Sequence, residues 1–306
     1  MISVIVLSKN NGDTLDACLN SIINALGEKE IIVVDAHSSD NTPSILEKYR
    51  EKIKVVYDEG KGIGIARNIG VKASKGDVIC FVDADAFVSK DHFIKIKDYF
   101  EKHPEISIIN VKGNEITSEK IPFIQKMEAK LYFLLNKSKY ESNKNEFQLA
   151  GGCFMAFRRK VFNDVKGFWE FPPYGADDLD FCMRALSRGW KIGILNVNSW
   201  HRHRTSLKDL LKEKIGWGKG LACFIWKWRK HPLIKKVYRQ SFVFKLLGND
   251  PLLITLIAYL SAPIIAIIHA IEGKSLSIYF YYIVRQYAIL IGFLYGLVTW
   301  TRKMKI

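Results

Sequence analysis

The apolar run at residues 78–82 ends in two aspartates, Asp83 and Asp85. Five consecutive apolar residues of this kind predict a buried strand. Because side chains two apart on an extended segment point the same way, the two carboxylates leave the carboxyl end of the strand together. Such a pair suits a hard divalent cation that also has phosphate ligands. The alternative is a solvated turn that holds two acids.

Segments with the patterns of strands and helices alternate along the first 200 residues. Strands are predicted at residues 3–8, 30–35, 53–57, 78–82, 106–111 and 191–197, and helices at 13–26, 42–49, 64–73, 91–101 and 121–135. This alternation is typical of an α/β fold, with a Rossmann-like, mainly parallel sheet and helices on both faces.

Polar residues follow several of the predicted strands, namely Ser8, Asn10, Asp35, Asp83 and Asp85. The carboxyl ends of parallel strands meet at one edge of a sheet, where a nucleotide can bind. A glycine-rich turn at 60–64 opens the helix of Arg67, which can contact a diphosphate or lie on the surface. The turn lacks the Gly-Lys-Ser/Thr of a Walker A loop, and it does not follow the first strand as a dinucleotide fingerprint would.

A second group of small and acidic residues lies between residues 150 and 205. Gly151 and Gly152 indicate a tight turn, while Asp177 and Asp178 open a predicted helix. Helix N-termini stabilise acids, so capping alone explains one or two of them. The same position keeps Asp178 ionised, as a general base requires. A basic loop with His201 and His203 follows; it can bind metal or diphosphate, or be merely solvated.

The net charge of +15 is concentrated in one part of the chain. Residues 206–249 are basic and aromatic, and residues 250–306 are very apolar. A basic, aromatic stretch beside an apolar tail predicts contact with an anionic membrane surface. A nucleic-acid patch is the competing interpretation, but no helix-turn-helix, zinc-finger or RRM pattern accompanies it, so we expect no nucleic-acid partner.

Two apolar stretches lie near the C-terminus. Residues 252–271 carry no formal charge, and about 20 such residues cross a bilayer core. Residues 278–300 contain Arg285, whose head can reach the interface by snorkelling. We therefore expect a transmembrane helical hairpin. The alternatives are one span plus a re-entrant or interfacial helix, and two buried core helices.

The flanking charges and the cysteines predict the location of the protein. Lysines and arginines flank both outer ends of the apolar region, which places both termini in the cytoplasm. The N-terminus has neither the basic region nor the apolar core of a signal peptide. Five scattered cysteines fit a reducing compartment. We expect a protein of the cell membrane whose globular part faces the cytoplasm.

These motifs together resemble the inverting family-2 glycosyltransferases of the GT-A fold. The resemblance covers roughly residues 1–205 and rests on Ser-Val-Ile-Val-Leu-Ser-Lys-Asn at 3–10, Val-Asp-Ala-His-Ser-Ser-Asp-Asn-Thr at 34–42, Ala-Arg-Asn-x-Gly at 66–70 and Asp-Ala-Asp at 83–85. The segment at 175–184 resembles the family's Glu-Asp-x-Asp-Leu-x-x-Arg, with Asp177 in place of the glutamate. The family often has Asp-Asp-Gly-Ser where this chain has Asp-Ala-His-Ser at 35–38, which affects the expected contacts to the base.

The resemblance implies a nucleotide-sugar donor and Mg²⁺ or Mn²⁺ as the cofactor. It assigns the donor to Ser8, Asn10, Asp35, Arg67 and Asp83, the metal to Asp83, Asp85 and His201 (with His203 as the alternate), the acceptor side to Gly151, Gly152 and Asp177, and the catalytic base to Asp178.

The expected organisation is a GT-A catalytic domain at 1–205, interfacial helices at 206–249 and the hairpin at 250–306. The expected function is a membrane-anchored, metal-dependent transfer of one sugar to a lipid-linked or saccharide acceptor. Residues 212–217 lack the glutamine and arginine of the Gln-x-x-Arg-Trp motif of processive synthases, which favours single transfer. The alternatives are transfer to a polyprenyl phosphate, a nucleotide-binding protein without catalysis, and a nucleotidyltransferase.

Overall fold

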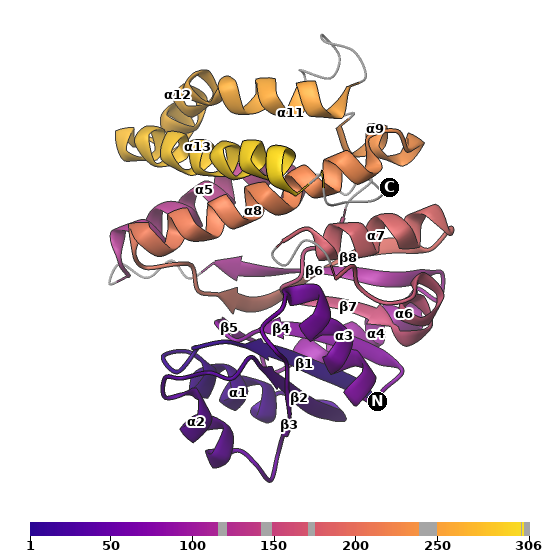
Figure 1. Cartoon of the computed structure of the whole chain (residues 1–306). Coiled ribbons are helices and arrows are strands. Elements are labelled where there is room, and N and C mark those ends of the chain that lie inside the picture. The colour runs from indigo at the N-terminus through magenta and orange to yellow at the C-terminus, as the bar shows by residue number, and fades with distance from the viewer. Residues whose placement is uncertain (116–120, 142–148, 171–174, 239–249, 301, 303–306) are drawn as a thin grey trace. The chain divides into compact units, whose positions relative to one another are not determined.

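The computed structural model describes residues 1–115, 121–141, 149–170, 175–238, 250–300 and 302 (Figure 1). The chain divides into two compact units. The sheet unit comprises Met1–Asn114, Leu149–Pro173 and Asp177–Arg202, and the helical unit comprises Glu115–Gln148, Tyr174–Ala176 and His203–Ile306.

An eight-stranded sheet forms the centre of the sheet unit, in the order β3-β2-β1-β4-β7-β6-β8-β5. Strands β3, β2, β1 and β4 run parallel to one another, whereas the β4–β7, β6–β7 and β5–β8 pairs are antiparallel. The prediction of a GT-A-like α/β sheet is confirmed, with a parallel half and a mixed half. The strands are β1 (Ile2–Ser8), β2 (Lys29–Asp35), β3 (Lys54–Tyr57), β4 (Val78–Asp83), β5 (Ala86–Phe87), β6 (Ile106–Glu115), β7 (Met155–Arg158) and β8 (Lys191–His201).

Helices cover both faces of this sheet, as predicted. Alternate residues of β1 show why: Val4 and Val6 join one apolar core, while Ile5 between them joins the other. The first core is completed by α1 (Leu15–Asn24), α2 (Thr42–Lys48) and α4 (His92–Lys102), and the second by α3 (Ile63–Ala73), α6 (Arg159–Val165) and α7 (Asp177–Ser187).

The helical unit is built around two helices that pack at backbone distance, α8 (Leu207–Trp228) and α13 (Leu276–Thr299). A Cβ atom on Gly218 would lie 2.0 Å from the carbonyl oxygen of Ile289, and one on Gly292 would lie 2.0 Å from that of Ile215. Only glycine permits so close a contact. The other described helices of the unit are α5 (Phe123–Glu141), α9 (Pro232–Tyr238), α11 (Pro251–Leu260) and α12 (Ala262–Glu272).

The C-terminal apolar region differs from the continuous first span that we predicted. Among the described residues, α13 alone is long and apolar enough to cross a membrane by itself. α11 and α12 pass that test only as a pair, and they are bent by 59°. Ser261 ends α11, and Pro263 lies in the first turn of α12, where its missing N–H is tolerated but would break a continuous helix.

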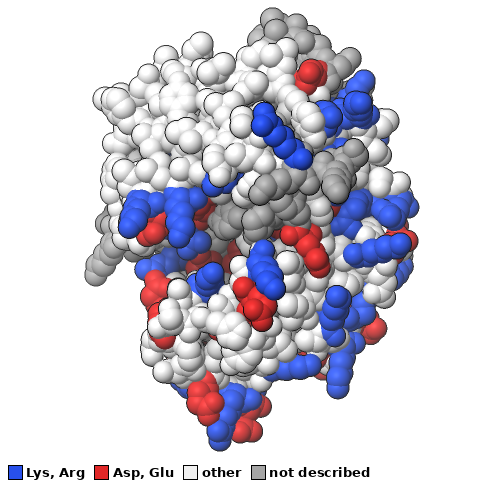
Figure 2. All heavy atoms as spheres, in the orientation of Figure 1, with Lys and Arg blue, Asp and Glu red and all other residues white. Residues whose placement is uncertain are grey.

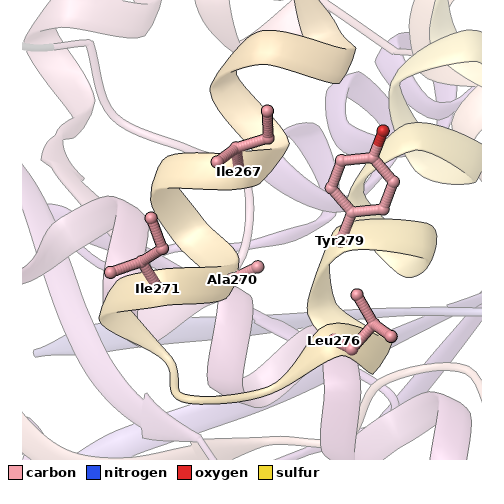
Figure 3. A pocket seen from close by; sticks show the side chains of 5 residues that line it. All are labelled: Ile267, Ala270, Ile271, Leu276 and Tyr279. Carbon is pink, nitrogen blue, oxygen red and sulfur yellow. The ribbon is translucent and has the colours of Figure 1, made fainter.

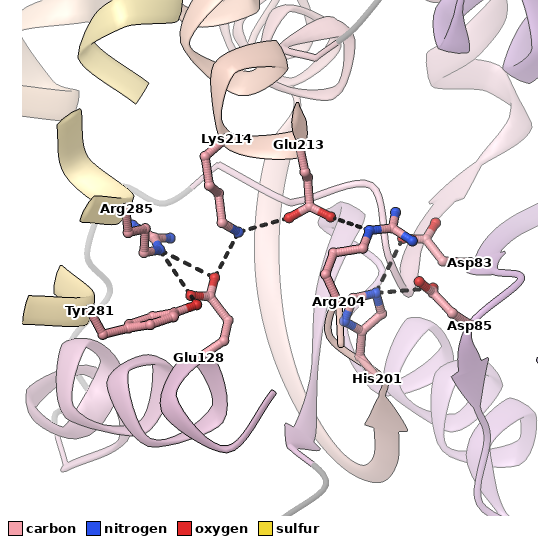
Figure 4. Close-up of polar contacts among 9 residues, drawn as sticks. All are labelled: Asp83, Asp85, Glu128, His201, Arg204, Glu213, Lys214, Tyr281 and Arg285. Carbon is pink, nitrogen blue, oxygen red and sulfur yellow. Dashed lines mark hydrogen bonds and ion pairs between the residues drawn. The ribbon is translucent and has the colours of Figure 1, made fainter. Parts of the chain in front are cut away.

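Arg285 of α13, whose head we expected at the membrane interface, contacts an acid of the same unit in this structure (Figure 4). Its Nε lies 3.2 and 3.1 Å from the two carboxylate oxygens of Glu128, which also accepts a hydrogen bond from Tyr281 (2.6 Å) and pairs with Lys214 (2.7 Å). Burial alone raises the pKa of Glu128, but Arg285 and Lys214 outweigh it and lower the pKa to about 2. Glu128 is therefore a fully paired, ionised group.

Candidate active site

The polar residues that end the parallel strands lie at one edge of the sheet, as predicted. The register pairs Ser8 with Asp35 and Leu7 with Asp83. Asp35 in turn pairs with Tyr57 at the end of β3. This edge is where α/β folds bind nucleotides.

A short antiparallel ladder brings His201 to the two aspartates. β5 pairs Ala86 with His201, and the N–H of Arg202 donates to the carbonyl of Asp85 (2.9 Å). The Nε2 atom of His201 lies 3.2 Å from Asp85 Oδ1 and 3.8 Å from Asp83 Oδ2 (Figure 4). Neighbouring ligands of one divalent cation stand about 3 Å apart, so this donor set fits a metal.

Of the two candidate histidines, His201 is the one in contact with these carboxylates. The ring of His203 instead lies 6.4 Å from that of Tyr132, within the helical unit.

The electrostatics of the pair favour a cation. Asp83 is 40% exposed, yet loss of solvent and the neighbouring charge of Asp85 raise its pKa, against a smaller opposing effect of His201 and Arg67. Asp83 and Asp85 bring two carboxylates close together beside His201. A bound divalent cation would offset the repulsion between them.

Cys153 is a candidate ligand that our reading of the sequence missed. Its Sγ, one oxygen of Asp83 and one nitrogen of His201 all lie within 4.8 Å of one another. The pairing of β4 with β7 ends at Cys80 and Ala156, and Cys153 lies in the loop just before β7. The local sequence around Cys153 therefore gives no signal of its neighbour Asp83.

Asp178 lies at the start of α7 and is oriented by two backbone N–H groups. Its Oδ2 accepts from Gly152 (2.7 Å) and its Oδ1 from Leu179 (2.8 Å). These two contacts fix the direction in which the carboxylate points. Asp178, the expected base, is therefore hydrogen-bonded to Gly152 of the expected acceptor loop.

Asp177 and Arg67 form a buried ion pair next to Asp178. Asp177 is 2% exposed, and its carboxylate contacts Nη1 of Arg67. Burial raises the pKa of Asp177 to about 6, although Arg67 opposes the shift. In this structure Asp177 holds Arg67 and is shielded from solvent, so its expected contact with the acceptor would be indirect.

The position of Arg67 explains why residue 152, one of the two glycines in the predicted acceptor loop, has no side chain. Its guanidinium lies 5.3 and 5.5 Å from the ring centroids of Phe81 and Phe168. A Cβ on Gly152 would lie 1.8 Å from Arg67 Nη2, whereas one on Gly151 meets nothing within 4 Å. Gly152 is required by packing, and the space above Gly151 is open. Arg67 Nε is buried and makes no hydrogen bond to the described residues.

The loop after β2, which departs from the family pattern, is well ordered by hydrogen bonds. Asp35 is 1% exposed and accepts from the N–H and hydroxyl of Ser38 (2.9 and 2.6 Å). The N–H of Asn10 donates to the same hydroxyl (2.8 Å). His37 has a positive φ of 51° and stacks on Tyr57 with ring centroids 5.2 Å apart. Ser8 Oγ is buried and unpaired within the described part of the chain.

Comparisons with known proteins agree with this geometry. The model of "Glycosyl transferase family 2" matches residues 3–166, more than half of the chain. Poly-beta-1,6-N-acetyl-D-glucosamine synthase of Staphylococcus aureus (strain MSSA476) is 24% identical over 228 residues, which are 72% of this chain and 54% of that protein. The chain therefore spans about half the length of this curated relative.

Solved structures show the same fold. Mannosyltransferase PcManGT from Pyrobaculum calidifontis, solved with GDP-Man and Mn²⁺, aligns with a TM-score of 0.66 at 19% identity over 98% of this chain and 87% of its own. Residues 1–349 of TarS from S. aureus, solved with UDP-GlcNAc, align with a TM-score of 0.53 at 18% identity over 93% and 90% of the two chains. With the family model, the motif residues and the sheet in agreement, the chain belongs to glycosyl transferase family 2 and has the GT-A fold.

Proposed function

We propose that this chain is a membrane-anchored, metal-dependent inverting glycosyltransferase that moves one sugar from a nucleotide-sugar donor to an acceptor at the membrane. The observation that carries the proposal is the meeting of Asp83, Asp85 and His201 at the nucleotide edge of the sheet. Asp178 belongs to the same unit. The neighbours solved with GDP-Man and Mn²⁺ and with UDP-GlcNAc support the donor class and the metal.

Asp83, Asp85 and His201 would hold Mg²⁺ or Mn²⁺. When bound, such a cation neutralises the charge that grows on the nucleoside diphosphate as it leaves. Arg67 is a buried cation of the same unit. Its fixed position, between two phenylalanine rings and against Asp177, suits a group that adds positive potential without reorganising.

Asp178 would act as the general base. Its two N–H contacts set the direction of the carboxylate, and each oxygen keeps a lone pair for an acceptor hydroxyl. The hydroxyl proton passes to Asp178 while the acceptor oxygen attacks the anomeric carbon from the face opposite the leaving group. The configuration at that carbon is inverted.

A saccharide acceptor is the form of this proposal that the comparisons favour. The curated relative reported above is named as a synthase of an N-acetyl-glucosamine polymer, and such an acceptor presents a hydroxyl. A polyprenyl phosphate is the alternative. It is an anion near neutral pH, so Asp178 would then orient it or balance charge rather than take a proton.

We propose that the helical unit supplies the membrane anchor. Its C-terminal helices expose large apolar side chains, among them Ile264, Ile271, Leu276, Phe280, Ile291 and Val298. Figure 2 shows few charged side chains over α12 and α13 on the face drawn. An open apolar hollow of about 490 Å³ lies between the end of α12 and the start of α13 (Figure 3). Both features suit lipid rather than water.

The packing of α8 limits how deep the anchor can sit. Ile215 of α8 lies against Gly292, and Ala222 lies against Gly296, so the two helices run side by side. The stretch of α8 that lies beside α13 contains Lys214 and Lys219. If α13 crossed the membrane along its full length, these two lysines would be placed inside the bilayer, which is unfavourable. The transmembrane hairpin stays a prediction, and this packing favours its re-entrant or interfacial alternative. The exposed basic residues of α8, such as Lys208 and Lys212, would then face anionic headgroups, with the sheet unit in the cytoplasm.

A transfer assay tests the proposed function. The full chain in detergent is mixed with Mn²⁺ and each of a set of UDP- and GDP-sugars, and stabilisation by ligand is measured as a shift in melting temperature. The donors that stabilise the protein are then assayed for release of free nucleoside diphosphate with saccharide or polyprenyl phosphate acceptors. Stabilisation by no nucleotide sugar would reject the proposal, and release of pyrophosphate from a nucleoside triphosphate would favour a nucleotidyltransferase instead.

A further inference from the structure

We infer that the cation site has a sulfur ligand, Cys153, and that the chain binds a soft divalent cation such as Zn²⁺ or Cd²⁺ through Cys153, Asp83 and His201. The inference rests on the proposed cation site and adds a second ligand set to it. The two sets share Asp83 and His201. They differ in the third ligand, which is Asp85 for a hard cation and Cys153 for a soft one.

The geometry of the three groups supports this set. The ligand atoms of Asp83, Cys153 and His201 lie within 4.8 Å of one another, and the His201–Asp83 pair is 3.8 Å apart. Zinc bound to nitrogen and oxygen at about 2.1 Å and to sulfur at about 2.3 Å needs ligand atoms between 3 and 4 Å apart. A small inward movement of the three side chains therefore suffices. Each of them is partly exposed, so a cation can enter from solvent.

The backbone holds Cys153 at this place. The preceding residue, Gly152, is clamped between Asp178, which accepts its N–H, and the guanidinium of Arg67. The following residue, Phe154, has a positive φ of 59° and is buried against the ring of His92. A left-handed backbone is unfavourable for phenylalanine, so packing on both sides holds it in place and sets the direction of the thiol.

The chemistry of the donors separates the two ligand sets. Thiolate sulfur selects zinc and other soft cations, whereas carboxylate oxygen and water suit Mg²⁺ and Mn²⁺. On binding, the Cys153 thiol loses its proton to solvent as the metal–sulfur bond forms. A tetrahedral zinc with three protein ligands keeps one open position. Zinc at this site would therefore offer a diphosphate fewer coordination positions than a six-coordinate cation does. Because the two ligand sets share Asp83 and His201, we also expect Zn²⁺ and Cd²⁺ to displace Mn²⁺.

The other cysteines are poor competitors for this role. Cys18, Cys80, Cys182 and Cys223 are all buried. Cys18 is the nearest alternative, because its Sγ lies 3.5 Å from the backbone oxygen of Asp83. It is fully shielded from solvent in the core under α1. It is therefore the matched control.

Cadmium titration of the full chain in detergent tests the inference without using activity. The probe is Cd²⁺ alone, followed through the ultraviolet charge-transfer absorption of a cadmium–thiolate bond, and Mn²⁺ binding is followed separately by electron paramagnetic resonance. We expect one cadmium per chain with this absorption in the wild type and in Cys18→Ala. Cys153→Ser should lose the absorption and bind Cd²⁺ about tenfold or more weakly, while its Mn²⁺ affinity stays within about twofold.

Two further variants separate the ligand sets. Asp83→Asn should weaken both cations, and Asp85→Asn should weaken Mn²⁺ far more than Cd²⁺. An unchanged cadmium band in Cys153→Ser, or its loss in Cys18→Ala, would overturn the inference. Either result leaves the proposed transfer reaction standing, and absence of transfer with the predicted cadmium spectrum would reject the function instead.

Discussion

Both units contain acidic side chains in contact with basic groups, but the charges around these acids differ between the units. In the helical unit, Glu128 contacts Lys214, Arg285 and the hydroxyl of Tyr281, and its pKa is lowered to about 2. In the sheet unit, Asp83 and Asp85 both contact His201, and burial together with the charge of Asp85 raises the pKa of Asp83. Figure 4 draws both groups.

The difference distinguishes a structural acid from a functional one. Glu128 has its counter-charges built into the chain, so nothing needs to bind for it to stay ionised. The Asp83–Asp85 pair places two carboxylates close together, and their mutual repulsion favours the binding of a cation. Removal of Glu128 should therefore affect folding, and removal of the sheet-unit acids should affect binding and chemistry.

The largest expected effect is on turnover, at Asp178. Asp178→Asn keeps the size of the side chain but removes the base, so turnover with a hydroxyl acceptor should fall by on the order of 10²–10⁴-fold. The measurement is the steady-state release of nucleoside diphosphate, with the melting temperature as a control for folding. A mild loss would count against the base and would favour a phosphate acceptor.

The largest expected effect on stability is at Glu128. Glu128→Gln leaves Arg285 buried without a full counter-charge and should lower the free energy of unfolding by about 3–5 kcal/mol. Chemical unfolding in detergent measures it. The surface pair Glu47–Arg50 offers the control, because both side chains are about two-thirds exposed, and Glu47→Gln should cost less than about 1 kcal/mol. Equal effects of the two substitutions would break the comparison between the units.

The pH dependence of stability sharpens the same point. The pKa of Glu128 is lowered from 4.5 to about 2 in the folded chain, so its contribution is complete above pH 4.5 and is lost as the pH falls toward 2. The difference in unfolding free energy between the wild type and Glu128→Gln should therefore shrink over that window. Unfolding curves at several pH values measure it, and a difference that stays constant would contradict the paired state of Glu128.

The smallest expected effects concern two adjacent glycines. Gly152→Ala places a Cβ against Arg67 and should cost about 1–3 kcal/mol of stability, because the buried Arg67–Asp177 pair must move. Gly151→Ala meets open space and should stay within about 0.5 kcal/mol of the wild type. Thermal unfolding compares the two variants. A larger cost for Gly151→Ala would mean that the loop is placed differently.

Sequence patterns predicted the strands, the helices and the parallel part of the sheet, because these depend on residues close together in the chain. The alternation of apolar residues in β1 follows directly from a strand covered on both faces, and the polar residues Ser8, Asp35 and Asp83 meet because parallel strands share a direction. The antiparallel half was not predicted, because the direction in which β7 pairs with β4 depends on a long connection.

The parts that were missed involve residues far apart in the sequence. Arg285 finds its partner Glu128 157 positions away, and an isolated apolar segment gives no sign of it. Cys153 was considered only as one of five scattered cysteines, because its neighbour Asp83 is supplied by another strand. The predicted hairpin did not include the bend beside Pro263, because proline is tolerated in spanning helices and no local rule says when it will bend one.

Binding of a nucleoside diphosphate with and without Mn²⁺ tests the central claim most directly. Calorimetry with UDP and GDP is performed on the wild type, Asp85→Asn and Glu128→Gln, the last at a temperature where it is folded. We predict that Mn²⁺ tightens binding about tenfold or more in the wild type and in Glu128→Gln, and has no effect in Asp85→Asn. An affinity that is the same with and without Mn²⁺ in the wild type, or a full metal effect in Asp85→Asn, would contradict the account.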